Sequence, residues 1–229
     1  MKRSFLLLIS VLVVFSSFGQ TINFSSDKFN NDYDTLCQLC NEYNHNNKVW
    51  ANELLKRFPV DNNGVIKLKY TITCSNDIDF EKCMQVTTNW FTYSFSSEAA
   101  IKKHDSEGVI YGEGRYINIS QYNLNAVYYA KVVNIHANTQ IGIKINDNTI
   151  DIVVYIKHYN LIYGDSLGRS ENSLVLIKNA YPCIDSKNKV AYSIAFINCY
   201  AVSFDKIKNY IEFLNTNMNT NLSEIDFMW

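Results

Sequence analysis

The hydrophobic pattern changes its period between residues 58 and 95, and this change constrains the fold more than any other feature. Apolar and polar residues alternate from Ile66 to Thr73, which predicts a strand with one buried face. From Phe80 to Phe95 the apolar spacing becomes three and four residues, which predicts a helix capped by Ser75-Asn76-Asp77. A turn at Asp105–Gly108 then leads into a long strand, Val109–Ile119. This order is typical of an α+β domain.

Later alternation predicts an antiparallel meander with one buried face. Three strands are expected, at Val127–Ile135, Gln140–Ile145 and Ile150–Tyr159. Turns at His136-Ala137-Asn138 and Asn146-Asp147-Asn148 join them.

The last element is the longest predicted helix, with an apolar stripe from Ile194 to Met218. A short strand-like stretch, Ser173–Lys178, precedes it after a polar loop over residues 163–172. The predicted fold class is α+β: an antiparallel sheet of about five to six strands with two helices packed on one face. A helical N-terminal extension over residues 32–57 comes before the sheet.

The first residues have the pattern of an export signal, which predicts that the protein is exported. Lys2 and Arg3 precede an apolar run from Ser4 to Phe15, and cleavage is expected after Gly19 or Gln20. The run is too short to span a bilayer, so no transmembrane segment is expected after its removal. The mature protein is therefore predicted to be periplasmic or secreted.

The predicted domain organisation has four parts. Residues 1–19 form the signal peptide, 20–57 a partly helical extension, 58–222 the α+β domain and 223–229 a C-terminal tail. Within the extension, residues 20–31 are polar and predict a flexible lead-in, and Asp32 or Asp34 can cap the helix that follows.

Charge excludes one class of partner. The chain has a formal net charge of −1, and loss of Lys2 and Arg3 takes it to −3. A slightly acidic chain without a basic run lacks the electrostatic footprint of a nucleic-acid binder, so no nucleic-acid partner is expected.

Six cysteines remain after the signal peptide. An exported chain with six cysteines can form up to three disulfides, and burial as free thiols is also open. Cys37-Gln38-Leu39-Cys40 has the spacing of a redox motif, but both thiols fall on the apolar stripe of a predicted helix without a strand before it, which favours a structural role. The possible disulfide cysteines are Cys37, Cys40, Cys74, Cys83, Cys183 and Cys199.

The histidines do not predict a metal or catalytic site. His45, His104, His136 and His158 are scattered, without ligand spacing. His104-Asp105-Ser106 contains the residue types of a catalytic triad, but consecutive turn residues cannot provide its geometry.

Two other patterns are also read as structural. Gly112 and Gly114, inside the long strand, indicate a bulge or a close backbone approach, and the bulge is favoured over a ligand site. Glu113 and Asp151 could face each other, but the sequence does not place them as a catalytic pair. No catalytic, cofactor-binding or metal-binding residue is predicted.

The face of the sheet opposite the isoleucines is the candidate interaction face. Tyrosines and charges together are enriched at recognition surfaces, although an ordinary solvated face is the simpler alternative. The residues expected on it are Lys144, Asp151, Val153, Tyr155, Lys157 and Tyr159.

Three motifs resemble a bacterial domain-of-unknown-function family with a TATA-binding-protein-like (TBP-like) fold, whose members are mostly exported. They are the turn and strand start Phe58-Pro59-Val60-Asp61 with Gly64-Val65-Ile66, the helix face from Trp90 to Ile101, and the stretch Asp105–Gly114. The likeness covers residues 58–217, with a weaker match at Asn146-Asp147-Asn148. These residues determine a fold, so the resemblance implies architecture. Because nothing in the chain reproduces a basic DNA-binding saddle, it implies no DNA binding.

The function expected from these observations is non-catalytic. We interpret the chain as a binding or assembly module of the bacterial cell envelope, with an envelope protein or a glycan as partner. The alternatives are a thiol-redox protein using Cys37 and Cys40, and a glycan-binding protein or an uncharacterised hydrolase, although no paired carboxylates indicate cleavage.

Overall fold

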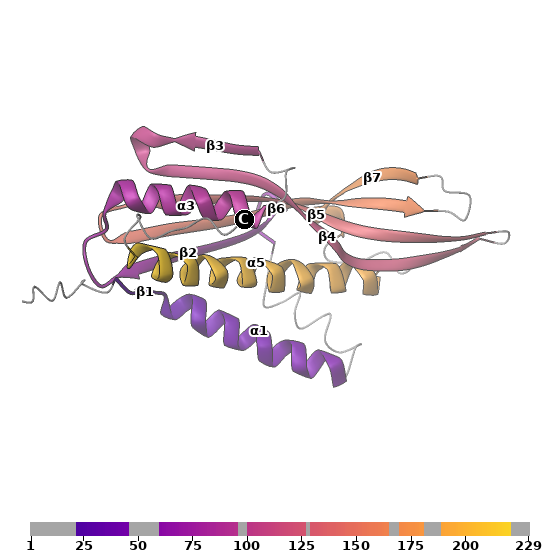
Figure 1. Ribbon diagram of the computed structural model, residues 1–229. Coiled ribbons are helices and arrows are strands. Elements are labelled where there is room, and N and C mark those ends of the chain that lie inside the picture. The colour runs from indigo at the N-terminus through magenta and orange to yellow at the C-terminus, as the bar shows by residue number, and fades with distance from the viewer. Residues whose placement is uncertain are drawn as a thin grey trace, which may run out of the picture.

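The computed structural model describes residues 22–45, 60–95, 100–126, 129–164, 170–180 and 189–220. The predicted signal peptide, the second half of the predicted extension and the C-terminal tail lie outside these residues. The predicted fold class is confirmed within them: one antiparallel sheet carries helices on one side (Figure 1).

The sheet has seven strands in the order β1-β2-β6-β5-β4-β3, and β7 also pairs with β6. β6 is long enough to pair first with β2, up to Ile156, and then with β7, from His158 onward. The strands are β1 (Phe24–Ser25), β2 (Ile66–Cys74), β3 (Ala100–His104), β4 (Val109–Ala126), β5 (Tyr129–Ile145), β6 (Thr149–Gly164) and β7 (Ser170–Leu176).

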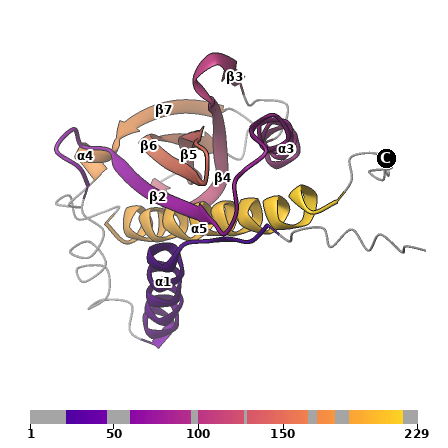
Figure 2. The ribbon, with the colours of Figure 1, turned by 90° about the vertical axis from the view of Figure 1, so that its left-hand side faces the viewer.

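Two helices cover the apolar face of the sheet, and a third packs beside them. The main helices are α3 (Phe80–Ser94) and α5 (Lys189–Met218), and α1 (Asp27–His45) lies on the far side of α5 from most of the sheet (Figures 1 and 2). Two short elements complete the described chain: the 3-10 turn η1 (Asp105–Glu107) and α4 (Ile177–Ala180). None of the helices in the described ranges has both the length and the apolar character needed to cross a membrane.

The alternating apolar residues of the strands form the hydrophobic core, as predicted. The even-numbered residues of β2 from Ile66 to Ile72 are buried, and so are those of β6 from Ile150 to Ile156. The fully buried Trp90 of α3 packs at 4.8 Å between ring centroids on Tyr210 of α5. Burying side chains of this size stabilises the fold by about 2–3 kcal/mol each.

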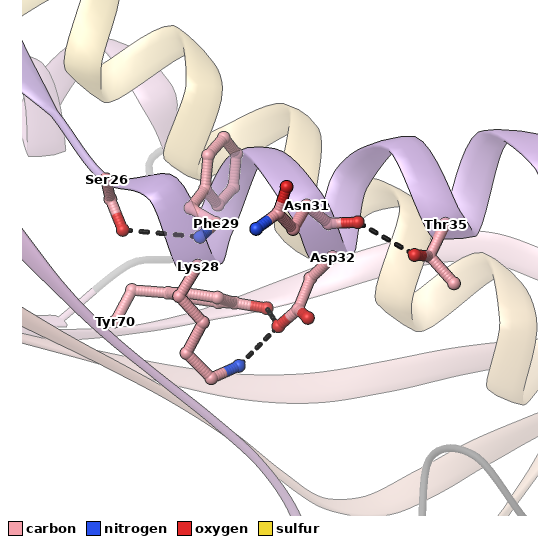
Figure 3. A network of polar contacts seen from close by, with 7 residues as sticks. All are labelled: Ser26, Lys28, Phe29, Asn31, Asp32, Thr35 and Tyr70. Carbon is pink, nitrogen blue, oxygen red and sulfur yellow. Dashed lines mark hydrogen bonds and ion pairs between the residues drawn. The ribbon is translucent and has the colours of Figure 1, made fainter.

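The N-terminal segment is ordered earlier than the sequence predicts. Residues 20–31 are not all a flexible lead-in, because β1 pairs with β2 and α1 begins at Asp27. Ser26, rather than Asp32 or Asp34, caps this helix, and its hydroxyl accepts from the Phe29 amide (Figure 3).

The side chain of Asp32 instead binds β2. Its carboxylate accepts hydrogen bonds from the Tyr70 hydroxyl at 3.1 Å and from the Lys28 ammonium group (Figure 3). Phe29 contacts both Tyr70 and Phe204, at 5.3 and 5.6 Å between ring centroids. The start of α1 therefore joins the main hydrophobic core.

Three strand and cap predictions are corrected. His136-Ala137-Asn138 is not a turn but the middle of β5, where the buried Ala137 pairs with Tyr116 and Tyr159. Asp79, not Ser75-Asn76-Asp77, caps α3 and accepts from the Lys82 amide. The predicted polar loop is shorter than expected, because β6 extends to Gly164 and β7 begins at Ser170.

The predicted bulge at Gly112 and Gly114 is also misplaced. The register shift in β4 lies between Tyr116 and Ser120, and Asn118 there has φ 51°. Asparagine tolerates this left-handed conformation better than most residues. Gly114 instead permits a close approach, because a Cβ there would lie 2.3 Å from the Phe95 ring.

Candidate functional site

The uncovered side of the sheet forms what we call the open face. Along each strand it carries the polar residues that alternate with the buried ones. The helices of the described part pack on the other side of the sheet (Figure 2). Among its described side chains five are cationic and two are carboxylates, and none of these five forms an ion pair within the described residues. The cations are Lys67, Lys69, Arg115, Lys144 and Lys157, and the carboxylates are Glu113 and Asp151.

The first five predicted interaction residues lie on the open face, and Tyr159 does not. Tyr159 is 1% exposed and stacks on Tyr192 of α5 at 6.1 Å between ring centroids. The reason is a β-bulge, since Asn138 pairs with His158 whereas Thr139 pairs with Ile156. Lys157 is therefore the extra residue, and side chains after it point to the opposite face from the one that simple alternation predicts.

This bulge produces an open pocket of about 200 Å³ on the open face. It lies where β6 exchanges β2 for β7 as its neighbour, next to the irregular segment of β4. The side chains that line it are Glu113, Arg115, Asn138, Gln140, Lys157 and His158.

A chain of hydrogen bonds crosses the pocket through Asn138. The Arg115 Nε atom donates to Asn138 Oδ1 at 3.4 Å, and Asn138 Nδ2 donates to His158 Nε2. In this arrangement the His158 imidazole is neutral, with its proton on Nδ1. On the other side of the pocket, Gln140 Nε2 donates to Glu113 Oε1.

Burial and nearby positive charge lower the pKa of two histidines here. Burial, followed by Lys157 and Arg115, lowers the pKa of His158 below its ordinary value of 6.5. Burial, followed by Arg115, likewise lowers the pKa of His136, whose Nδ1 atom is buried and has no hydrogen-bond partner among the described residues. The sequence does not predict that two of its scattered histidines flank one arginine.

The other half of the open face is a shallower surface beside β2. Lys67 Nζ lies 5.2 Å from the centre of the Tyr155 ring, a cation–π contact. Gly142 leaves open space, because a Cβ there would have no atom within 4 Å. Asp151 accepts from the Thr71 hydroxyl at 2.5 Å.

The four cysteines whose side chains are described are free thiols. Cys37 is exposed, Cys74 is half-buried, and Cys83 and Cys199 are buried. Burial raises the pKa of Cys83 to about 12 and also raises that of Cys199. The Cys40 side chain and Cys183 lie outside the described residues.

Neither of the other sequence candidates forms a site. Glu113 pairs with Gln140 and Asp151 with Lys144, so the two carboxylates lie on opposite sides of β5. Cys37 lies in the third turn of α1, far from the helix N-terminus whose dipole activates a redox thiol. In the described parts of the chain, no group of three or more His, Cys, Asp or Glu side chains could hold a metal ion.

Most pocket residues were missed by the sequence analysis, which placed only Lys157 on a functional surface. One signal could have located the pocket. Buried residues of β6 are even-numbered up to Ile156 and odd-numbered from Tyr159, and this change of phase requires an inserted residue. Arg115 and Asn138 carry no such signal, because only the pairing of β4 with β5 brings them together.

Comparison with known proteins identifies structural similarity alone. The sequence matches no family model and no curated protein. The structure is similar to a TBP-like protein from Parabacteroides distasonis, with 14% identity, a TM-score of 0.40, and coverage of 66% of this chain and 97% of that chain. It is also similar to a DUF4468 family protein from Bacteroides ovatus, with 10% identity, a TM-score of 0.41, and coverage of 69% of this chain and 94% of that chain.

Proposed function

We propose that this protein is a non-catalytic binding or assembly module of the bacterial cell envelope and that it docks its partner through the open face. The observation that carries the proposal is the composition of that face. It combines five cations and two tyrosines, Tyr111 and Tyr155, and the described helices leave it uncovered.

The charge of this face is opposite to that of the whole chain. The protein has a formal net charge of −1, yet its open face is basic. Unpaired cations are strongly hydrated and contribute little to folding, whereas they steer an oppositely charged partner and determine which partner fits. The partner that best fits this surface is an acidic envelope protein.

Photo-cross-linking in cells tests the proposal. A photoreactive phenylalanine analogue replaces Tyr155 on the open face in one strain and Tyr93 in another; Tyr93 is 64% exposed on α3. We expect a specific adduct from position 155 and none from position 93. Protease digestion of the adduct separates a protein partner from a glycan.

A charge reversal provides the matched control. Lys67→Glu removes the cation beside Tyr155, and it should reduce the adduct at position 155 at least about tenfold, because like charges at an interface cost several kcal/mol. Lys208→Glu makes the same charge change on α5, beside the Tyr33 ring and on the helix side of the sheet, and should leave the adduct unchanged. Equal adducts from positions 155 and 93 would refute docking through the open face.

A further inference from the structure

The pocket on the open face has a charge that calls for one negative ligand group. Arg115 from β4 and Lys157 from β6 reach it from the two sides of β5. Neither cation has a carboxylate within ion-pair distance among the described residues. Glu113 is the one acidic side chain in the lining, and because the His158 ring accepts from the Asn138 amide as a neutral imidazole, the lining has a net charge of +1. A monoanion balances this charge, whereas a phosphate dianion exceeds it.

The unused donors match the shape of a carboxylate. Arg115 gives only its Nε hydrogen to Asn138, so the described structure leaves its two terminal nitrogen atoms available. A guanidinium group presents its donors in a planar fork that binds both oxygen atoms of a carboxylate. Lys157 supplies a further ammonium group, and the His158 ring also lines the pocket.

Two exposed leucines lie near the pocket on the open face, outside its lining. Leu176 of β7 is paired with His158 and is 38% exposed, and Leu174 is paired with Asn160 and is 57% exposed. Directly paired residues share a face, so both leucines lie on the open face, Leu176 beside the pocket residue His158 and Leu174 beside Asn160, two residues farther along β6. Exposed leucines that adjoin a charged pocket favour a ligand whose charged group carries an apolar neighbour.

We propose that this pocket binds the carboxylate of a ligand whose adjacent group is apolar, such as a peptide C-terminus that ends in an aliphatic residue or a small aliphatic acid. Arg115 grips both carboxylate oxygens, Lys157 adds the second charge, and Leu174 and Leu176 contact the apolar group. The proposal deepens the binding role proposed above and rests on it.

Titration of the purified protein with matched probes, monitored by NMR and calorimetry, tests whether the pocket recognises a carboxylate. The probe is N-acetyl-leucine, and its neutral control is N-acetyl-leucine amide. We expect the acid to shift the backbone signals of Arg115, Asn138 and His158 and to bind at least about tenfold more tightly than the amide, because charge-assisted hydrogen bonds are lost with the amide. N-acetylglycine should bind more weakly than N-acetyl-leucine, because it lacks the group that contacts the leucines.

Further titrations identify which kind of molecule supplies the carboxylate and whether the pocket binds any anion. Octanoate tests a free aliphatic acid and a leucine-terminated pentapeptide tests a chain end, and tighter binding of either one assigns the source. Inorganic phosphate tests a general anion site. Binding of phosphate as tight as that of N-acetyl-leucine would overturn the carboxylate assignment, as would equal binding of the acid and the amide.

Variants locate the binding site. Arg115→Gln and, independently, Lys157→Gln should each weaken N-acetyl-leucine at least about tenfold. Lys69→Gln makes the same charge change on the open face outside the pocket and should bind like the wild type. Unchanged binding in both pocket variants would contradict the proposal. Because the two variants are tested independently, poor folding of one leaves the other to decide.

The outcome can be separated from that of the proposed function. If N-acetyl-leucine does not bind while the adduct at position 155 persists, the carboxylate pocket is refuted and docking through the open face stands. If the adduct is also absent, both proposals fail.

Discussion

At the scale of single residues, two glycines of the central strands differ in what surrounds them. Gly114 of β4 lies under the Phe95 ring, where a Cβ would come within 2.3 Å of Cδ1. Trp90 and Phe91 hold this ring in place, with ring centroids 6.0 and 5.6 Å from it. A Cβ on Gly142 of β5 would contact no atom within 4 Å. One glycine is required by packing, and the other leaves space on the open face.

Alanine at these two positions should have opposite effects. Gly114→Ala should lower the free energy of unfolding by about 1–3 kcal/mol, because the held ring must move. Gly142→Ala should be neutral or stabilising by up to about 1 kcal/mol, since it only restricts the unfolded chain. Urea unfolding of the two variants measures both changes. Equal destabilisation by both would contradict the packing of Phe95 against β4.

Single residues also decide which face of the sheet the side chains of a strand point to. Alternation correctly places Asp151 and Tyr155 on the open face, yet it misplaces Tyr159. A single extra residue, Lys157, reverses the alternation. Its effect is visible in the sequence only as a shift of the apolar residues from even to odd positions.

At the scale of elements, α3 and α5 are joined by polar contacts inside an apolar interface. Thr87 and Tyr210 are both buried, and their hydroxyl oxygens lie 2.8 Å apart. The Trp90 indole donates to Asn209 Oδ1 at 2.9 Å. At the end of α5, the Lys82 ammonium group donates to the Met218 and Thr220 carbonyl groups, both at 2.7 Å. These bonds fix the position of α3 along α5.

Removing the buried hydroxyl of Tyr210 should weaken this interface. Tyr210→Phe leaves the Thr87 hydroxyl without that partner and should cost about 1–2 kcal/mol of unfolding free energy. The double variant Thr87→Val, Tyr210→Phe should cost less than the sum of the single variants, because neither polar atom is then left behind. A double-mutant cycle from urea unfolding measures the coupling, and strictly additive costs would show that the two hydroxyls do not interact.

Element types were predictable because each has a period of its own. The helices at Trp90 and at Phe204 and the strands of β2 and β6 follow from apolar spacing alone. The ends of these elements could not be predicted in the same way, because a polar residue such as Asn138 continues a strand when the neighbouring strands pair with it. Likewise, the start of α1 depends on Phe29 packing against Tyr70, which is distant in sequence.

At the scale of the whole molecule, stability should depend on pH through His136 and His158. Both have a pKa below 6.5 in the folded protein, so below that pH the unfolded chain binds more protons than the folded one. Stability should therefore be greatest above about pH 6.5 and should fall as the pH drops toward 5. Arg115 faces both rings, Lys157 also acts on His158, and Glu113 is bound by Gln140.

Thermal unfolding from pH 8 to pH 5 measures this dependence. In the double variant His136→Asn, His158→Gln, stability should decrease less between pH 8 and pH 5, because the new side chains do not gain a charge in this range. His158→Gln keeps an acceptor for the Asn138 amide, which separates the loss of charge from the loss of a hydrogen bond. A decrease as steep in the variant as in the wild type would show that other groups cause it.

The sequence by itself determined the α+β class, the buried faces of the main strands and helices, and the mixture of tyrosine and charge on the opposite face around Tyr155. These properties depend on local periodicity, which each segment carries alone. Only the tertiary structure decided the strand order, the partner change of β6 and the pocket that unites Arg115, Asn138 and His158. Such features depend on the register between distant segments, and register is settled when the whole core packs at once.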